Sequence, residues 1–525
     1  MLRRCWKFLK SVLKRVEEVL AMRTRRTMLN LAFSVVSLFA SSVLSLLLTR
    51  VVLQHLGSDY NGLNGTISQF MAVLMLVESG FTIAALVKLY KPYGDEDYQA
   101  INEILSKANI EFRKIGFVMV GLGFAVSAIY ASIIKTSVEY GIIIVLFFYS
   151  IATTAFNFAY TYKFRIMFQV AQREYVIYAV NILQHLIVYI GMILIIQYTK
   201  SIIYARSFYV LINICAGLAI GIIAKKLFPR ARYNVDCSNI RIEGTKDLFM
   251  SKLVGILYTS LTPFYLAVFV GTLQTSVYVV YNSVISVISN LINTALTAPQ
   301  NALGQIINSE KEKVKKTVIE YEYSALLISA ILLTSTMALI IPFVRFYTTG
   351  VNDINYIQPS VAIILVLISA SQLIHIPSGK CIELSGDFKA VKRIQLTTFF
   401  LLAVLSIVGA SSAGLIGLLT AQLVTNVVLA WMEISYAHRK IINDTTGFLK
   451  MLYPHIGLAL LLSVLECGLL YEVQINWISF VGIGLIVVIV NAVLFCLWGY
   501  VFFRAQMLPI FTRLTKIIKK LFATR

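Results

Sequence analysis

The sequence predicts an all-α polytopic membrane protein, and both its composition and its long apolar runs support this fold class. Of the 525 residues, 58% are hydrophobic and 14% are charged, and the mean hydropathy is +0.80. A soluble domain carries about 25% charged residues. Many runs reach the roughly 20 apolar residues that a spanning helix needs, whereas strands of a membrane barrel would alternate polar and apolar residues over about ten positions.

Fourteen apolar runs give the predicted membrane-spanning helices. The first two are joined by an outer turn at residues 55–62, and the later helices repeat this pair. The connections are short, so none of them holds a soluble domain. The runs cover approximately residues 28–50, 62–90, 113–134, 140–163, 174–198, 202–226, 248–272, 275–300, 318–342, 355–379, 391–411, 414–438, 451–471 and 477–503.

Basic residues set the expected orientation in the membrane. With an even number of spans and the N-terminus inside, 41 of the 46 Lys and Arg residues lie on the inner side and five on the outer side. The positive-inside rule therefore predicts that both termini are cytoplasmic. This rule explains the net charge of +21 without a nucleic-acid partner. Basic amphipathic helices at both ends of the chain are expected to bind the anionic lipids of the inner leaflet.

The chain also contains an internal repeat. An offset of 214 residues places runs one to six on runs seven to twelve, so that Gly57 meets Gly271 and the segment 168–175 meets 382–389. Six is an even number, so the two halves should have the same orientation, as in transporters built from parallel repeats. We expect two six-helix lobes plus two extra helices.

This repeat defines the predicted division of the chain. It comprises an amphipathic basic helix on the cytoplasmic face (1–27), an N-lobe of helices 1–6 (28–227), a basic cytoplasmic linker (228–247), a C-lobe of helices 7–12 (248–441), helices 13 and 14 (450–503) and a basic amphipathic tail (504–525).

Polar residues inside the apolar runs are candidates for the lining of a cavity between the lobes. Such residues usually face a bundle interior, although hydroxyls also serve close helix packing and basic residues near helix ends also reach the interface. A guanidinium can bind a diphosphate through two bonds, and amides, hydroxyls and tyrosines suit a sugar. A deep carboxylate should be protonated or paired, which allows proton coupling or pairing with a cavity cation. The candidate binding residues are Arg50, Asn64, Glu78, Lys88, His185, Lys252, Tyr278, Asn282, Asn293, His375 and Lys380.

Motifs of enzymes and metal sites are missing from the sequence. It contains no P-loop, no HExxH and no G-x-S-x-G elbow, and its six cysteines are scattered without ligand spacing. We therefore expect no catalytic residue, no metal and no cofactor. Without an ATP site, transport would be driven by an ion gradient, the membrane potential or the substrate gradient.

Three short segments and the helix layout carry a family resemblance. They are Arg50–Leu63 (RVVLQHLGSDYNGL), Ser79–Gly80 and Ala171–Arg173, where Gln172 replaces a glycine that is frequent in the family. With six plus six plus two helices, the chain resembles the multidrug/oligosaccharidyl-lipid/polysaccharide exporter superfamily, and within it the polysaccharide-transporter branch. The resemblance implies a V-shaped bundle that works by alternating access in the bacterial cytoplasmic membrane. It also implies an undecaprenyl-diphosphate-linked oligosaccharide as substrate, with a polysaccharide polymerase and glycosyltransferases as partners.

Four functions are compatible with these observations. The first is a flippase for repeat units of O-antigen, capsule or exopolysaccharide, which accounts for the repeat and the polar inner faces. A cation-coupled multidrug antiporter would need several deep acids, and only Glu78, Glu433 and Glu466 qualify. A non-transporting membrane scaffold would depend on the amphipathic ends. A membrane glycosyltransferase is disfavoured because no acidic loop motif is present.

Overall fold

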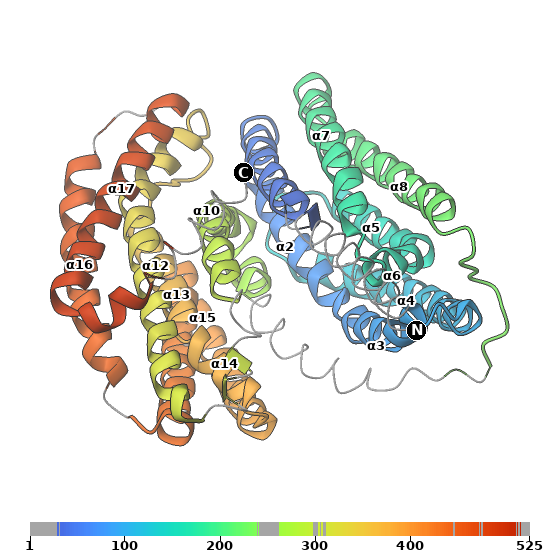
Figure 1. The fold of residues 1–525 in the computed structure, drawn as a ribbon. Coiled ribbons are helices and arrows are strands. Elements are labelled where there is room, and N and C mark those ends of the chain that lie inside the picture. The colour runs from blue at the N-terminus through green and yellow to red at the C-terminus, as the bar shows by residue number, and fades with distance from the viewer. Residues whose placement is uncertain are drawn as a thin grey trace, which may run out of the picture. The chain divides into compact units, whose positions relative to one another are not determined.

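Every regular element of the described chain is a helix (Figure 1). The computed structural model describes residues 29–238 except 31, then 240, 262–297, 303–304, 306–307, 311–444, 447–471, 473, 476–510, 512 and 515. Within these residues, 11 helices are long and apolar enough to cross a membrane, judged by length and composition. The prediction of an all-α polytopic membrane protein is therefore confirmed.

The chain divides into two compact units, which we describe separately. The first unit contains Met1–Tyr60 and Ile67–Leu257, and the second contains Asn61–Thr66 and Tyr258–Arg525. The helices of the first unit are a helix over Ala32–Leu56, α2 (Ser58–Leu74, of which Asn61–Thr66 belong to the second unit), α3 (Leu76–Gly94), α4 (Tyr98–Ile133), α5 (Tyr140–Phe156), the π-helical turn η1 (Asn157–Thr161), α6 (Tyr162–Val170), α7 (Glu174–Thr199) and α8 (Ile202–Leu227).

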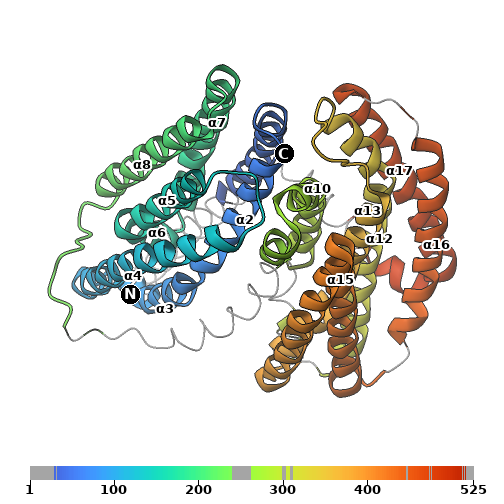
Figure 2. The ribbon, with the colours of Figure 1, turned by 180° about the vertical axis from the view of Figure 1, so that it is seen from behind.

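The longest helix of the first unit, α4, packs against α5 and α3, while α7 runs beside α8 (Figure 2). Asp97 begins α4 as its N-cap, where its carboxylate accepts hydrogen bonds from the backbone N–H groups of Gln99 and Ala100. The first turns of α4 carry ion pairs of Glu111 with Lys107 and Lys114. The helix therefore begins well before the apolar run at 113–134, because charged pairs stabilise its polar end.

The second unit is arranged around α12, which packs against α13, α16 and α17 (Figure 1). A buried cluster of Tyr323, Leu326, Phe448 and Phe495 fills the space between α12, α16 and α17. The helices of this unit are η2 (Leu266–Val270), α10 (Thr272–Thr297), α12 (Lys311–Tyr347), α13 (Pro359–Ile374), α14 (Ile376–Leu384), α15 (Phe388–Ala437), η3 (His438–Ile442), α16 (Gly447–Leu470) and α17 (Trp477–Phe502).

Helix α15 combines the two predicted runs 391–411 and 414–438. Its backbone leaves helical geometry at Ala413 and at Gly414, where φ is 57° and ψ is −130°. The two halves then approach closely, since a Cβ added to Gly409 would lie 2.4 Å from the carbonyl oxygen of Gly417. The predicted boundary between these runs therefore coincides with a sharp bend.

Backbone geometry supports the 214-residue repeat. Glycines with positive φ stand at both Gly57 (93°) and Gly271 (122°), and each N–H donates to the carbonyl five residues earlier. Two more pairs of residues with positive φ have the same offset, and they are Gln172 with Gly386 (54° and 81°) and Lys200 with Gly414 (51° and 57°). Equal turns at equal spacing in the described residues are what the predicted repeat requires.

Two predicted runs differ from the helices observed. The first helix continues past Arg50 to Leu56 and ends before Gly57, because only the glycine adopts the positive φ that breaks the helix. The second run is divided between α2 and α3 at Met75. Most of the seventh run, with the termini 1–28 and 516–525, lies outside the described residues.

Candidate functional site

A polar pocket of about 190 Å³ lies in the first unit, where α3, α6 and α7 meet. Its volume is below the roughly 300 Å³ at which drug-sized ligand pockets begin, so it suits one small polar moiety of a larger ligand. The lining residues are Thr82, Tyr162, Arg165, Ile166, Gln169, Glu174, Ile177 and Tyr178.

The turn between α6 and α7 brings the polar side chains of this pocket together. Side chains four residues apart share one face of a helix, as Arg165 and Gln169 do on α6. Only three residues join the helices, and the N–H of Gln172 donates to the carbonyl of Gln169 at 3.0 Å. The side chain of Asn30 contacts the same turn, because its Oδ1 accepts from the N–H of Tyr175 at 2.7 Å.

The pocket offers hydrogen-bonding groups that the described residues leave unused. Arg165 makes a cation–π contact with the ring of Tyr162, with the guanidinium carbon 5.5 Å from the ring centre, and no ion pair within the described chain. The Oε1 atom of Gln169 is buried without a hydrogen-bond partner. Glu174 and Tyr178 add a carboxylate and a phenol to the lining. Donors and acceptors in such a small space can bind a sugar hydroxyl set or an anionic group.

The second unit contains an apolar groove of about 490 Å³ between α12, α13 and α16. Most of its walls are aliphatic, and several of these side chains are well exposed, including Leu460 and Val464. A groove of this kind on membrane-spanning helices suits a hydrocarbon chain, because its aliphatic walls offer van der Waals contacts and few polar groups.

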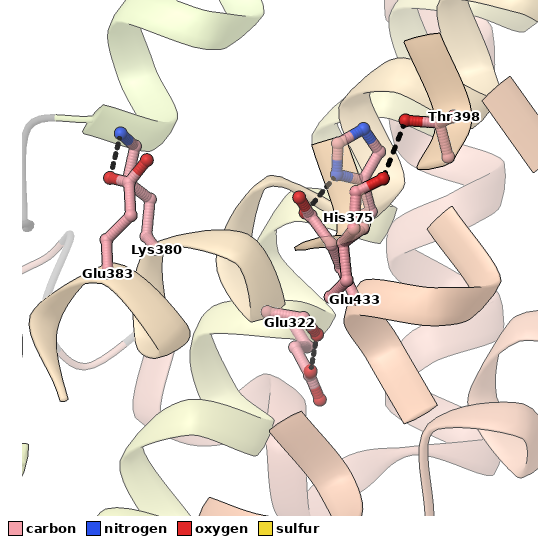
Figure 3. A network of polar contacts seen from close by, with 8 residues as sticks. Glu322, His375, Lys380, Glu383, Thr398 and Glu433 are labelled. Carbon is pink, nitrogen blue, oxygen red and sulfur yellow. Dashed lines mark hydrogen bonds and ion pairs between the residues drawn. The ribbon is translucent and has the colours of Figure 1, made fainter. Parts of the chain in front are cut away.

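The same unit contains two acid–histidine pairs, His438 with Glu322 and His375 with Glu433. Figure 3 shows the second pair and the carboxylate of Glu322. On α12, the carboxylate of Glu322 lies 3.0 Å from Nε2 of His438 and accepts a 2.7 Å bond from the hydroxyl of Ser378. His375, between α13 and α14, places Nδ1 2.7 Å from Oε2 of Glu433 on α15. Within the described ranges, no group of three or more His, Cys, Asp or Glu residues is arranged to hold a metal ion.

The structure locates nine of the predicted site residues with their side chains. Arg50, Asn64, His185, Asn282, His375 and Lys380 are half-buried, Tyr278 is buried, and Lys88 and Asn293 are exposed. The ring of His185 contacts that of Tyr189 with centres 5.9 Å apart, and Lys380 forms an ion pair with Glu383 at 2.7 Å (Figure 3). The side chain of Glu78 and the whole of Lys252 lie outside the described residues. The role of these residues in lining a cavity stays a prediction.

Sequence reasoning missed the residues of the polar pocket and both members of the Glu322–His438 pair, whereas it named His375 and Glu433 without pairing them. Arg165 and Gln169 follow the end of a predicted run, where basic and polar residues are typical of an inner loop. Their spacing of four on a continuing helix was the signal that could have identified them. Glu322 stands near the start of a run, and only the folded chain brings His438 to it.

Comparison with known proteins identifies the fold. No family of protein sequences matches the chain, and no curated protein does. Among solved structures, the lipid II flippase MurJ in an inward closed conformation is similar with a TM-score of 0.68 and 13% identity, over 90% of this chain and 99% of that chain. An inward-facing MATE family multidrug resistance transporter of the MOP superfamily gives a TM-score of 0.58 and 15% identity, over 78% and 96% of the two chains. A MOP superfamily transporter from Pyrococcus furiosus gives 0.53 and 15%, over 79% and 94%. The chain therefore has the fold of MurJ and of the MATE transporters.

Proposed function

We propose that this protein is a flippase for a lipid-linked oligosaccharide in a bacterial cytoplasmic membrane. The polar pocket of the first unit carries this proposal. It holds a guanidinium and a buried amide oxygen that have no ion-pair or hydrogen-bond partner among the described residues, and these groups can bind one phosphate or sugar group of a sugar-diphosphate headgroup. The substrate would be an undecaprenyl-diphosphate-linked repeat unit for surface polysaccharide. A polymerase and glycosyltransferases are the partners that this substrate would require.

The apolar groove of the second unit supports an amphiphilic substrate. An oligosaccharide has no favourable contacts with walls formed by Leu333, Val366 and Leu460, whereas a prenyl chain does. The similarity in fold to a lipid II flippase adds that this scaffold can move a lipid-linked molecule. Polar and apolar sites in one chain fit the two ends of such a molecule.

Replacement of Arg165 tests the proposed headgroup site. Full-length protein is placed in liposomes with undecaprenyl diphosphate that carries one fluorescent N-acetylglucosamine derivative, and the rate of its movement between leaflets is measured. We expect Arg165→Gln to slow this movement about tenfold or more, because a hydrogen bond to a charged group contributes about 1.5–3 kcal/mol. Thermal unfolding of the same sample checks that the variant is folded.

Arg113→Gln is the matched control, since Arg113 is an exposed cation on α4 that does not line the pocket. It removes the same charge and should leave the rate unchanged. Equal rates for Arg165→Gln and the wild type would refute the proposed headgroup site. Failure of the wild type to move the probe, in liposomes that retain folded protein, would refute the proposed function.

A cation-coupled drug antiporter is the alternative function. Its cavity would need acids that are available to a cationic drug, but Glu433 is paired with His375, and Glu466 accepts a 3.1 Å hydrogen bond from Asn491. Drug susceptibility of a deletion strain separates the two functions, because loss of the flippase would alter surface polysaccharide instead.

A further inference from the structure

The second unit buries ionisable side chains at positions where the first unit has alanine. The pairs at the 214-residue offset are Glu322 with Ala108, Glu433 with Ala219, and His438 with Ala224. Since alanine supports the corresponding helices of the first unit, the repeated fold does not require ionisable groups there. Burial of a charged side chain inside a protein costs several kcal/mol of folding free energy. The presence of these groups therefore needs a reason other than stability of the fold. Ionisable residues inside membrane helices mark ion pathways and proton relays in many transporters.

His438 has both ring nitrogens engaged. Its Nδ1 lies 2.5 Å from the backbone carbonyl oxygen of Asp444, and its Nε2 lies 3.0 and 3.1 Å from the two carboxyl oxygens of Glu322. A carbonyl oxygen can only accept, so Nδ1 carries a proton, and one more proton lies between Nε2 and the carboxyl group. The His438–Glu322 pair is neutral as a whole, and its ring has no vacant position for another proton.

His375 differs because only one of its ring nitrogens is engaged. Nδ1 donates to Oε2 of Glu433 at 2.7 Å, and no described residue forms a hydrogen bond with Nε2. The side chains are 14% and 10% exposed. A proton can therefore bind to the lone pair of Nε2 without breaking the bond at Nδ1. This uptake changes the His375–Glu433 pair from a net negative charge to neutrality.

The pair lies at the junction between two helices of one span. His375 is the single residue between α13 and α14, and the residue at the equivalent position of the first unit, Thr161, ends the π-helical turn η1. The carboxylate of Glu433 rests against α14, since a Cβ added to Gly379 would lie 2.4 Å from its Oε2. A change in the charge of the pair therefore acts directly on the junction of two helices.

Several charged groups on the neighbouring elements are paired with one another. On α12 and η3, Glu322 and His438 form the neutral pair described above. On α14, Lys380 is paired with Glu383 (Figure 3). On α15, the nearer end carries Asp387, which is bound to Tyr436. Within the described second unit, the His375–Glu433 pair is thus the acid–histidine pair that can gain one proton without losing a hydrogen bond.

We propose that the His375–Glu433 pair binds a coupling proton, so that the transport cycle draws on the proton gradient. One proton is taken from water at Nε2 of His375 and is returned to water later in the cycle, while the bond at Nδ1 is kept. This proposal rests on the proposed transport function. It names the proton as the coupling ion and the His375–Glu433 pair as its binding site. Lipid movement by itself would reveal neither of them.

The test compares lipid movement with and without a pH gradient across the liposome membrane. The probe is again undecaprenyl diphosphate with one fluorescent N-acetylglucosamine derivative. We expect the wild-type rate to change by up to about tenfold per pH unit, the limit for one proton. Glu433→Gln should retain movement without a gradient and lose this response. Glu139→Gln, which alters an exposed acid of an outer loop, should retain both.

A second measurement does not need transport. Infrared difference spectra of the full-length protein between acidic and neutral pH should show a carboxylate band that shifts on proton uptake and is missing in Glu433→Gln. If the probe does not move but the band is present, the proton site stands and the proposed substrate is wrong. If the probe moves and Glu433→Gln responds to the pH gradient as the wild type does, the proton site is overturned.

Discussion

The turn between α6 and α7 and the turn between α14 and α15 follow the same backbone path with different residues. In the first unit α6 ends at Val170 and Gln172 has a φ of 54°, and in the second α14 ends at Leu384 and Gly386 has a φ of 81°. The first turn leads into a helix without a side-chain cap, and the second into one that is capped by Asp387. The repeat thus conserves turn geometry, while side chains around it are free to take different roles.

Equivalent positions inside the helices next to these turns also carry different residues in the two units. The first unit has a polar pocket that includes Arg165 beside the turn between α6 and α7, and at the position equivalent to Arg165 the second unit has Gly379, which lies against Glu433. One unit therefore keeps polar groups available for a ligand, and the other closes its polar groups on one another. Variants that place the residue of one unit at the equivalent position of the other can show whether that residue is required for stability or for function.

The largest effect is expected from Glu322→Ala, which removes one partner of the buried pair. It leaves His438, with its side chain 3% exposed, without its carboxylate, and breaking such a pair typically costs about 3–5 kcal/mol. The double variant Glu322→Ala/His438→Ala installs the alanines of the first unit at both positions. We expect it to unfold at a higher temperature than the single variant, because no charge stays unpaired.

Thermal unfolding of the purified full-length protein in detergent measures both variants. A double-mutant cycle with His438→Ala gives the interaction free energy of the pair. If the free energy of unfolding lost in the double variant equals the sum of the losses in the two single variants, Glu322 and His438 have no interaction free energy. The second unit would then differ from the first by packing alone.

An intermediate effect is expected from the turn that contains Gln172 and the turn that contains Gly386. Gly386→Ala should destabilise the protein by about 1 kcal/mol, because an L side chain in the left-handed region costs roughly that much. Nothing lies within 4 Å of a Cβ added at Gly386, so this cost is conformational and not steric. Gln172→Gly should have the opposite sign and raise the unfolding temperature. A loss of stability in Gln172→Gly would show that the glutamine side chain has a role that Gly386 does not share.

These turns also show what the sequence could predict. Gly57 and Gly271 stand between long apolar runs, so local chemistry was enough to find the turns, the helices and the repeat. In the sequence, Gln172 was recognised only because it replaces a glycine that is frequent in the family that the chain resembles. Its positive φ confirms that it has the same left-handed backbone conformation as Gly386. The polar pocket and the pair of Glu322 with His438 depend on contacts between residues distant in the sequence, which helix periodicity does not encode.

The smallest effect is expected from the cap of α15, and it depends on pH. The hydroxyl of Tyr436 and the N–H of Ala390 donate to the carboxylate of Asp387 and hold its pKa below the usual value. A group with a lowered pKa in the folded state stabilises the protein above the unfolded pKa, about 3.9 for Asp, and loses this contribution as the pH falls through the folded pKa. We expect Asp387→Ala to lower the unfolding temperature at neutral pH, with a difference that shrinks at acidic pH.

Arg173→Ala, at the equivalent uncapped position of α7, should show no such pH dependence. A difference between Asp387→Ala and the wild type that is constant from neutral to acidic pH would mean that the ionised carboxylate does not stabilise the start of α15.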